Sequence, residues 1–301
     1  MWVKKKMKIA IYIRQYSAEN EGILDTLLGL LNDGDRVCVE NEILNELRTH
    51  SDRFEGLCGF GGFEDLDDSF DVMLTIGGDG TLLKSIGYIR DLEIPVLGIN
   101  SGRLGFLATA HKDNLQTVVQ QLRERSYEIV ERSVIEAVFS DDLTPVAEVN
   151  FAMNEITVTR KNTASMITID TELDGDYLCS YWADGLMIAT PTGSTGYSLS
   201  CGGPVILPTA KNFVLTPIAP HNLSARPLII PEDTEVRLTI SGRAKKYLLS
   251  LDSQILSLPN KRGVIIRRAP FVVRMIRLGG DSFVKTLRSK LLWGEDRRNK
   301  V

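Results

Sequence analysis

Residues Val72 to Thr81 constrain the fold more than any other stretch, because they join an apolar run directly to a glycine turn. The run reads Val-Met-Leu-Thr-Ile and the turn reads Gly-Gly-Asp-Gly-Thr. A short run of β-branched and aliphatic residues that ends in glycines is typical of a buried strand followed by a tight turn. The apolar residues that follow recur at helical spacing, namely Leu82, Leu83, Ile86 and Ile89. The stretch therefore predicts a strand, a turn and a helix.

The glycines of this turn suit a phosphate group. Glycines adopt positive φ and leave backbone N–H groups open to a ligand, and a helix N-terminus adds a partial positive charge. Asp79 does not fit that purpose, because its carboxylate would repel phosphates. A carboxylate in this position is useful if it handles a proton or a metal ion. The alternative is structural, with Asp79 capping the following helix.

Length and composition indicate a globular protein of about two domains. The chain has 301 residues, of which 43% are hydrophobic and 25% are charged. A net charge of −4 gives no reason to expect a nucleic acid or a membrane surface as a partner. No apolar run is long enough for a membrane span or a signal peptide core, so we expect a cytoplasmic location.

The cysteines and histidines indicate neither a disulfide framework nor a zinc site. Cys38, Cys58, Cys179 and Cys201 show no close pairing in the sequence. The three histidines do not combine with them at the spacing of metal ligands.

Strand and helix patterns alternate through the first hundred residues. Strands are expected over 8–13, 36–40, 72–76 and 94–99, and helices over 23–31, 42–49, the segment after Thr81, and 114–125. Residues 56–62 are rich in glycine and predict a loop. Alternation of this kind predicts a parallel sheet covered by helices, in which ligands bind beyond the carboxyl ends of the strands. The turn from Gly77 to Gly80 lies at such an end.

The pattern changes to short strands after residue 131. Strands are expected over 134–139, 149–159, 166–173, 177–182, 235–240, 247–251, 264–268 and 271–276. Asp174-Gly175 is a strong hairpin signal. Helical spacing returns over 282–293. We therefore expect an α/β domain over 1–131, an all-β domain over 132–276, and a helical tail over 277–301 that packs back on one of them.

Two polar stretches interrupt the β half. Asn154 and Glu155 are adjacent in a strand-like run, so both reach one ligand only if the strand ends or bulges there. The alternative is a surface dipeptide. Residues 184–203 combine glycines with hydroxyls and predict a loop whose free N–H and O–H donors suit sugars and phosphates, with Tyr197 as a stacking face. A flexible linker is the alternative, and Pro191 and Leu199 argue against it.

A third stretch, residues 100–107, reads Asn-Ser-Gly-Arg-Leu-Gly-Phe-Leu. Its two glycines and Phe106 indicate either a shaped loop near a ligand or an apolar lid on the core.

These motifs, taken in order, resemble the NAD kinase family. The matching segments are 77–81, 100–107, 154–155, 184–185 with 189–197, 220–227, 251–254 and 287–294. The glycine turn alone is less specific, since lipid kinases of the diacylglycerol and sphingosine type carry a similar element. The resemblance implies ATP-dependent phosphorylation of the 2′-hydroxyl of the adenosine ribose of NAD. It also implies a Rossmann-like α/β domain joined to a β-sandwich-like domain, with the active site in the crevice between them.

The resemblance implies roles for the residues of the first half. Asp79 is the general-base candidate for the 2′-hydroxyl, and Phe106 lies against adenine. The phosphate-binding positions are Gly78, Gly80 and Thr81. Magnesium enters with ATP, because Mg²⁺ keeps water and phosphate ligands and needs few from protein.

In the second half, the resemblance implies that Asn154 binds adenine and Glu155 binds the ribose hydroxyls. The loop around NAD contains Thr192, Thr195 and Tyr197. Asp184 matches a carboxylate that binds NAD, in some members from a neighbouring subunit, and a homodimer or homotetramer is expected. The sequence departs from the family at Gly196, where many members have alanine.

Three other functions compete with this hypothesis. A lipid kinase needs an apolar entry for acyl chains, whereas the second half offers hydroxyls. A non-catalytic NAD sensor has no use for a carboxylate inside the phosphate turn. A dehydrogenase is disfavoured because no Gly-x-Gly-x-x-Gly motif with a later acidic residue is present in the first strand-helix-strand unit.

Overall fold

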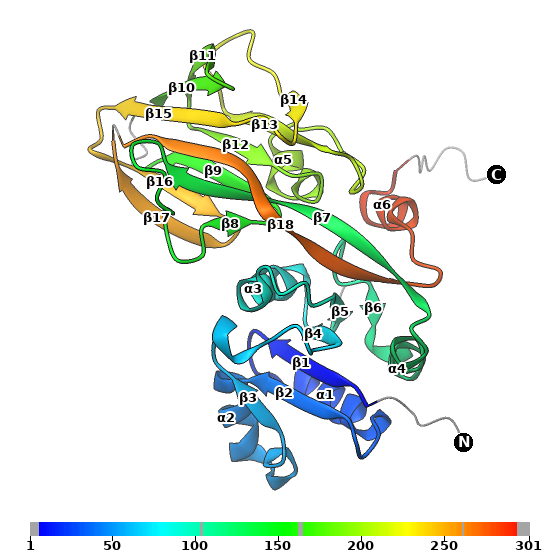
Figure 1. The fold of residues 1–301 in the computed structure, drawn as a ribbon. Coiled ribbons are helices and arrows are strands. Elements are labelled where there is room, and N and C mark those ends of the chain that lie inside the picture. Colours follow the sequence, from blue (N-terminus) through cyan, green and yellow to red (C-terminus); the bar gives the residue numbers. More distant parts are fainter. Residues whose placement is uncertain (1–5, 103–104, 162–164, 261, 294–301) are drawn as a thin grey trace, which may run out of the picture. The chain divides into compact units, whose positions relative to one another are not determined.

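The computed structural model describes residues 6–102, 105–161, 165–260 and 262–293. The chain forms two compact units, which are described separately here (Figure 1). Unit 1 comprises residues 1–131 and 273–301, and unit 2 comprises residues 132–272. The chain passes from one unit to the other within strand β7 (Tyr127–Phe139) and returns within strand β18 (Val264–Leu278). Among the motif residues, Arg103, Leu104 and Gly294 lie outside the described part.

Unit 1 is built on a parallel sheet. Its strands lie in the order β18, β5, β4, β1, β2 and β3, with β6 beside β5. Their bounds are Lys8–Ile13 for β1, Arg36–Glu40 for β2, Cys58–Phe60 for β3, Val72–Ile76 for β4, Val96–Asn100 for β5 and Ala110–His111 for β6. Every residue of β4 and of β5 is buried, as expected for central strands that helices cover on both faces.

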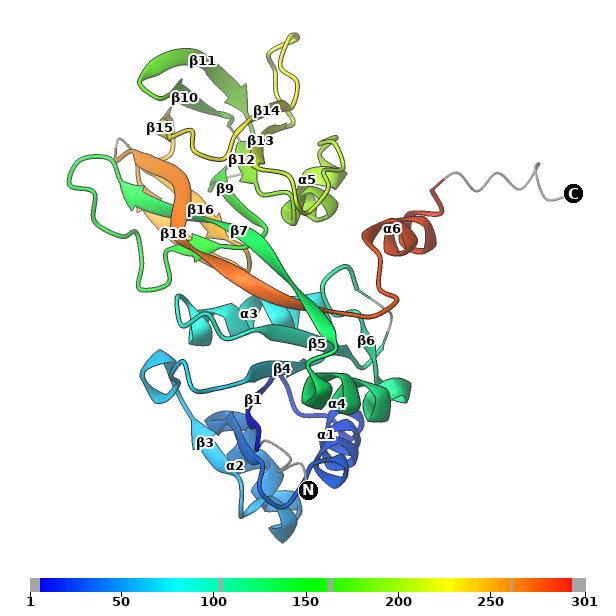
Figure 2. The same cartoon turned by 45° about the vertical axis from the view of Figure 1, so that its right-hand side comes forward.

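Helices cover both faces of this sheet. They are α1 (Ala18–Leu30), α2 (Asn41–His50), α3 (Asp79–Ile89) and α4 (Leu115–Glu124), with short 3-10 turns at Asp52–Phe54, Phe63–Asp65 and Lys112–Asn114. Helix α6 (Phe283–Leu291) follows β18 and buries none of its residues. The buried residues of α1, α2 and α4 form one core with Ile9 and Ile11 of β1, and Figure 2 shows α1 and α4 side by side. Helix α3 lies on the opposite face, where Tyr88 contacts Tyr12 of β1.

The order of the strands reverses between β1 and β4. The chain builds β2 and β3 on one side of β1 and then places β4 on the other side. In open α/β sheets, ligands bind beyond the carboxyl ends of the strands at such a switch point. Arg14 directly follows β1 and Gly77 directly follows β4. The glycine turn therefore lies where the topology of unit 1 predicts a ligand.

Unit 2 is a sandwich of antiparallel sheets. One six-stranded sheet has the order β14, β13, β12, β9, β16 and β17. Its strands are β9 (Glu155–Arg160), β12 (Gly185–Ala189), β13 (Asn212–Ile218), β14 (Leu228–Pro231), β16 (Lys246–Leu251) and β17 (Gln254–Pro259). Facing it are β10 (Ile167–Leu173), β11 (Asp176–Ala183), β15 (Val236–Gly242) and the first part of β18, with β7 pairing the two-residue strand β8 (Phe151–Ala152). Apolar residues from both layers form one core.

The fold class predicted from the sequence is confirmed, whereas several strands were missed. The predicted glycine-rich loop over 56–62 contains β3, and the predicted loop over 184–203 begins with β12. Strands β13, β14 and β17 have no counterpart in the prediction. The predicted strand over 149–159 divides into β8 and β9, and the two predicted strands around Pro270 form the single strand β18.

The expectation that no disulfide forms is wrong, since Cys38 and Cys58 are bonded. These residues are direct partners on the parallel strands β2 and β3, with their Cα atoms 4.4 Å apart. The sequence hid this pairing because the edge strand β3 lies in a glycine-rich stretch. Cys179 and Cys201 are free thiols. The cytoplasmic location stays a prediction. Among the described residues, no helix combines the length and apolar composition needed to cross a membrane.

We expect a reductant to lower the stability of the wild-type protein. A cross-link over 20 residues restricts the unfolded chain, which corresponds to about 3 kcal/mol of unfolding free energy. Urea unfolding with and without dithiothreitol measures this difference. The Cys38→Ala/Cys58→Ala double variant should not respond to the reductant, whereas Cys179→Ser should respond like the wild type. A wild-type unfolding curve that dithiothreitol leaves unchanged would contradict the expectation.

Candidate functional site

The turn between β4 and α3 requires glycine at its first position. Gly77 has φ +148°, and a Cβ atom there would lie 2.4 Å from the Thr81 Oγ1 atom. The Thr81 N–H donates to the Gly78 carbonyl at 2.9 Å, which closes the first turn of α3. Gly78 and Gly80 are exposed, and no side chain caps the helix. The start of α3 therefore presents bare backbone toward solvent.

The Asp79 carboxylate does not cap α3; it holds a distant loop of the same unit. Its Oδ2 atom accepts the Phe106 N–H at 2.8 Å, and its Oδ1 atom accepts those of Leu107 at 3.0 Å and Ala108 at 2.9 Å. Gly105 makes this approach possible, because a Cβ atom there would lie 1.8 Å from Asp79 Oδ1. The alternative left open by the sequence, that Asp79 caps the following helix, is wrong, because the carboxylate instead holds the loop over 105–108.

Phe106 lies against the C-terminal helix. Its ring is half-buried and contacts the ring of Phe283 of α6, with centroids 6.2 Å apart. The sequence left open whether this loop faces a ligand or covers the core, and the contact with α6 accounts for part of the apolar ring surface. Phe283 was missed because only the helical spacing of the tail was considered.

Arg14 stands beside the glycine turn and was also missed. Its Nη1 atom lies 3.6 Å from the position that a Cβ atom of Gly80 would take. Arg14 is exposed, and no ion pair involves it in the described part of the chain. The signal was its position directly after the first predicted strand. Lys84 lies on α3, four residues after Gly80, and is exposed.

In unit 2, the Asp252 carboxylate makes the same kind of contact with the segment between β8 and β9. Its Oδ2 atom accepts the Met153 N–H at 2.9 Å, and its Oδ1 atom accepts those of Asn154 at 2.9 Å and Glu155 at 3.0 Å. The Asp252 N–H donates to the Glu155 carbonyl at 3.0 Å. Sequence reasoning placed Asp252 in a motif but gave it no role.

Thr190 holds the same segment from its carbonyl side. The Thr190 N–H donates to the Asn154 carbonyl at 2.9 Å, and its hydroxyl donates to the Met153 carbonyl at 2.6 Å. Together with Asp252, Thr190 therefore satisfies all six backbone polar groups of residues 153 to 155.

Two side-chain oxygens of this segment, unlike its backbone groups, have no hydrogen-bond partner among the described residues. They are Asn154 Oδ1 and Glu155 Oε2, and both are buried. Both side chains face Gly196, since a Cβ atom there would lie 3.3 Å from Glu155 Oε2 and 3.6 Å from Asn154 Nδ2. Buried polar atoms of this kind normally have partners. The pair is therefore ready to bind an external hydrogen-bonding group.

Burial perturbs the pKa values of both carboxyls, and the charge of Asp252 acts in addition on Glu155. Burial, reinforced by the charge of Asp252, raises the pKa of Glu155 to about 8. Burial raises the pKa of Asp252 to about 6, while the N–H bonds from residues 153 to 155 lower it. Perturbed carboxyls of this kind are more frequent at functional sites than elsewhere.

The segment over 184–203 is not the open, donor-rich loop that the sequence predicts. It begins with the fully buried strand β12 and continues through the 3-10 turn Gly193–Thr195 and the short helix α5 (Tyr197–Ser200). The hydroxyls of Ser194 and Ser198 are buried and bond to Pro191 and Thr216. These hydroxyls serve the fold, because buried O–H groups must find partners inside the protein.

The predicted residues of that segment differ in exposure. Thr192 is buried, and the Thr195 hydroxyl donates to the Thr192 carbonyl at 3.3 Å. Tyr197 is 47% exposed, so part of its ring remains available for stacking. Burial and the Cys201 thiol raise the pKa of Tyr197, and the charges of Asp184 and Glu155 add to the effect.

Asp184 lies at the other end of β12 from Thr190. It forms a two-pronged ion pair with Arg160 of β9, with Nε–Oδ1 and Nη2–Oδ2 distances of 2.9 Å. Five strand residues, roughly 16 Å, separate it from the Asn154–Glu155 end of the strand pair. The structure thus brings Asn154 and Glu155 together against Gly196, and the charges of both Glu155 and Asp184 act on Tyr197. Within the described ranges, no group of three or more His, Cys, Asp and Glu side chains is arranged to hold a metal ion.

We expect Glu155→Gln to stabilise the fold at alkaline pH. The unfolded chain releases the Glu155 proton near pH 4.5 and the folded protein near pH 8, so the stability due to Glu155 is lost as the pH rises through this interval. Glutamine does not ionise. At about pH 9 the free energy of unfolding of the variant should exceed that of the wild type by roughly 1 kcal/mol or more, whereas at about pH 4.5 the two should differ little. Urea unfolding at both pH values measures this, and an equal difference at both would contradict it.

Two family models of known proteins match this chain, one in each half of the sequence. Residues 60–127 match the family model described as the ATP-NAD kinase N-terminal domain, and residues 153–278 match the ATP-NAD kinase C-terminal domain. The NAD kinase of Christiangramia forsetii is 51% identical over 294 residues, which cover 97% of this chain and 100% of that protein. The NAD kinase of Flavobacterium psychrophilum is 48% identical over 297 residues, with 97% and 100% coverage.

Solved structures share the fold. Yeast NADH kinase complexed with NADH superposes with a TM-score of 0.87 at 24% identity, covering 100% of this chain and 92% of that chain. An NAD kinase from Archaeoglobus fulgidus in complex with ATP superposes with a TM-score of 0.73 at 24% identity, covering 95% and 99%. With two matched domain models and relatives of this identity over their full length, the chain belongs to the NAD kinase family and is an enzyme of that type.

Proposed function

We propose that this enzyme transfers the γ-phosphoryl group of MgATP to the 2′-hydroxyl of the adenosine ribose of NAD, giving NADP. The observation that carries this proposal is the Asn154–Glu155 pair. Among the described residues, the buried atoms Asn154 Oδ1 and Glu155 Oε2 have no hydrogen-bond partner, although the backbone of both residues is fully bonded. An amide can bind the edge of adenine, and a carboxylate can accept hydrogen bonds from ribose hydroxyls. The relatives named NAD kinase, and the solved relatives that hold NADH and ATP, support the same substrates.

The glycine turn of unit 1 is the proposed phosphate site. The uncapped start of α3 offers backbone N–H groups and the positive end of the helix dipole. Gly78 and Gly80 supply this backbone, and the Arg14 guanidinium beside Gly80 supplies positive charge. Thr81, whose N–H already donates to the Gly78 carbonyl, occupies the third position that the family resemblance assigns to phosphate. The divalent ion is brought by the nucleotide, since magnesium binds phosphate oxygens and water readily.

Asp79 is the proposed general base. A ribose hydroxyl is a poor nucleophile until a base within hydrogen-bond reach takes its proton. A carboxylate has about four acceptor positions, so the three N–H bonds from residues 106 to 108 leave one for the hydroxyl. Phosphoryl transfer otherwise depends mostly on alignment and on neutralising charge. Phe106 carries the apolar surface proposed for adenine on the loop that Asp79 holds.

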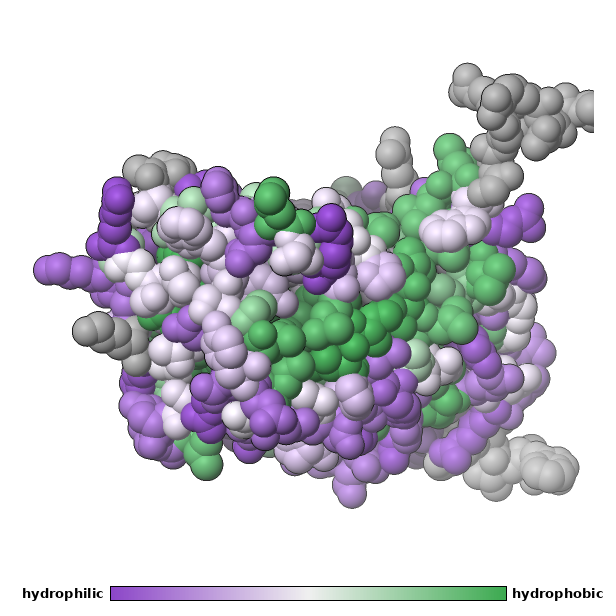
Figure 3. Space-filling view, turned by 90° about the horizontal axis from the view of Figure 1, so that it is seen from above, coloured by the Kyte–Doolittle hydropathy of each residue, from purple (hydrophilic) through white to green (hydrophobic). Residues whose placement is uncertain are grey.

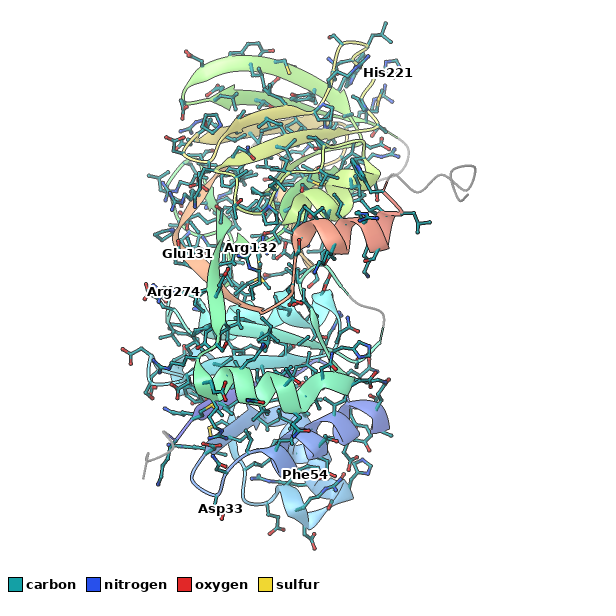
Figure 4. All side chains as sticks on the ribbon, turned by 90° about the vertical axis from the view of Figure 1, so that its right-hand side faces the viewer. Asp33, Phe54, Glu131, Arg132, His221 and Arg274 are labelled. Atoms are coloured by element: carbon teal, nitrogen blue, oxygen red, sulfur yellow. A yellow bond between two sulfur atoms is a disulfide. The ribbon has the colours of Figure 1, made fainter. Side chains whose placement is uncertain are left out.

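We also propose that the enzyme assembles as a homodimer or homotetramer through unit 2. The edge strands β11 and β14 carry exposed apolar side chains, among them Tyr177, Trp182 and Ile229. Figure 3 shows hydrophobic side chains gathered over a broad area of the face seen there. His221, labelled in Figure 4, packs on Trp182 with the two ring centroids 5.9 Å apart. Trp182 remains 54% exposed. Areas of this kind mark interaction surfaces. The family resemblance implies that Asp184 binds NAD, in some members from a neighbouring subunit, and this role stays a prediction.

We expect Asp79→Asn to lower the turnover of NADP formation by roughly a hundredfold or more while leaving NAD affinity nearly intact. A coupled assay with MgATP and NAD measures turnover, and calorimetry measures NAD affinity. Because asparagine presents an NH₂ group to the loop, Gly105→Ala serves as the control: it crowds the same contact but keeps the carboxylate. Gly105→Ala should therefore retain much more of the wild-type turnover than Asp79→Asn. Wild-type turnover in Asp79→Asn would remove Asp79 from the role of base, and absence of NADP formation by the wild type would refute the proposed reaction.

We expect Arg14→Ala to raise the KM for ATP by roughly tenfold, because a charge-assisted bond to phosphate is lost. The KM for NAD should change little. Lys84→Ala is the control, since it removes another exposed cation of unit 1, on α3 four residues after Gly80. Equal effects of the two substitutions on the KM for ATP would indicate a general loss of positive charge and contradict a specific role for Arg14.

A further inference from the structure

We infer that Asp252 is a positioning residue for NAD: its carboxylate fixes the backbone that presents Asn154 and Glu155, and its charge sets the electrostatic state in which Glu155 meets the ribose. This role rests on the proposed binding of NAD to that pair. Asp252 does not bind the substrate itself. It acts through residues 153 to 155, which lie 97 to 99 positions earlier in the chain.

The geometry of the strand explains why such a residue is needed. Neighbouring residues on a regular strand face opposite sides, so Asn154 and Glu155 could not both reach one ligand. The chain solves this by ending β8 at Ala152 and starting β9 at Glu155. At this interruption the N–H groups of residues 153 to 155 do not bond to a neighbouring strand. Each of their N–H groups donates to Asp252 instead.

Asp252 is itself held in place for this task. It lies in the turn between β16 and β17, which are paired with each other, and β16 is paired with β9. Its φ of +48° is an uncommon conformation that asparagine and aspartate tolerate best among residues with a Cβ atom. Its own N–H closes the contact by donating to the Glu155 carbonyl. The carboxylate therefore meets the interruption from a rigid hairpin.

The electrostatic part of the role follows from the groups around Glu155. The titratable groups that face it are Asp252 from the β16–β17 turn, Tyr197 from α5, and Cys201 directly after α5. Burial and the Asp252 charge raise the pKa of Glu155 to about 8. If ribose hydroxyls donate to the Glu155 carboxylate, NAD binding strengthens as the pH rises toward that value. Removing the Asp252 charge lowers the pKa of Glu155 and moves the transition to lower pH.

The test is Asp252→Asn, which keeps the size of the side chain and its tolerance of positive φ. We expect the Kd and KM for NAD to rise roughly tenfold, because asparagine opposes one N–H with its own NH₂ group. The KM for ATP should stay near the wild-type value. The midpoint of the pH dependence of NAD binding, measured by calorimetry, should shift to lower pH. A purely structural role would not move that midpoint.

Asp174→Asn is the matched control. Asp174 also has positive φ, lies in a hairpin turn of the same unit and accepts a backbone N–H, that of Glu235 at 2.9 Å. It is not in contact with residues 153 to 155, and its substitution should leave NAD binding unchanged. A second variant, Thr190→Val, loosens the same backbone from the carbonyl side without removing a charge. It should weaken NAD binding and leave the pH midpoint in place.

Hydrogen exchange separates this inference from the proposed reaction. In Asp252→Asn the amides of residues 153 to 155 should exchange faster than in the wild type, whether or not the enzyme forms NADP. Wild-type exchange at these amides together with wild-type NAD binding would overturn the inference. Should Asp252→Asn fail to fold, a Thr190→Val variant with wild-type NAD affinity would overturn it equally. Failure of the wild type to form NADP would refute the reaction and leave the exchange result to decide the role of Asp252.

Discussion

A carboxylate that accepts three consecutive backbone N–H groups is the interaction on which the candidate functional segment of each unit depends. Asp79 holds residues 106 to 108 in unit 1, and Asp252 holds residues 153 to 155 in unit 2. A hydrogen bond to a charged group contributes about 1.5–3 kcal/mol, and ordering the backbone of one residue costs about 1–2 kcal/mol. Three bonds therefore suffice to order three residues. Neither segment belongs to a helix, and neither needs a bound ligand to be ordered.

This arrangement separates the task of holding a segment from that of binding a substrate. In unit 2 every backbone polar group of residues 153 to 155 has a partner, whereas Asn154 Oδ1 and Glu155 Oε2 have none in the part of the chain that the structure describes. In unit 1 the same carboxylate that orders the loop retains an acceptor position for chemistry. Interactions that are in place before the substrate arrives need no reorganisation when it binds, which is the general requirement for efficient catalysis of phosphoryl transfer.

The sequence predicted what is local and missed what depends on distant partners. The strand, turn and helix around Asp79 follow from ten adjacent residues, and the hairpin at Asp174-Gly175 follows from two, both of which adopt positive φ. The partners of Asp79 and Asp252 lie 27 to 29 and 97 to 99 positions away, so no spacing pattern reveals them. Strand β12 was hidden because a strand buried on both faces lacks alternation, and its glycine and hydroxyl neighbours look like a loop. The disulfide was hidden for a related reason, since it joins an edge strand of three residues.

The most direct test of this account is the amide hydrogen exchange of the wild-type protein with and without NAD. If the two carboxylates order their segments in advance, the amides of residues 106 to 108 and 153 to 155 are protected in the free protein, and NAD adds little to their protection. Rapid exchange of these amides in the free protein, with protection that develops only when NAD binds, would show that the substrate orders the segments and would contradict the account.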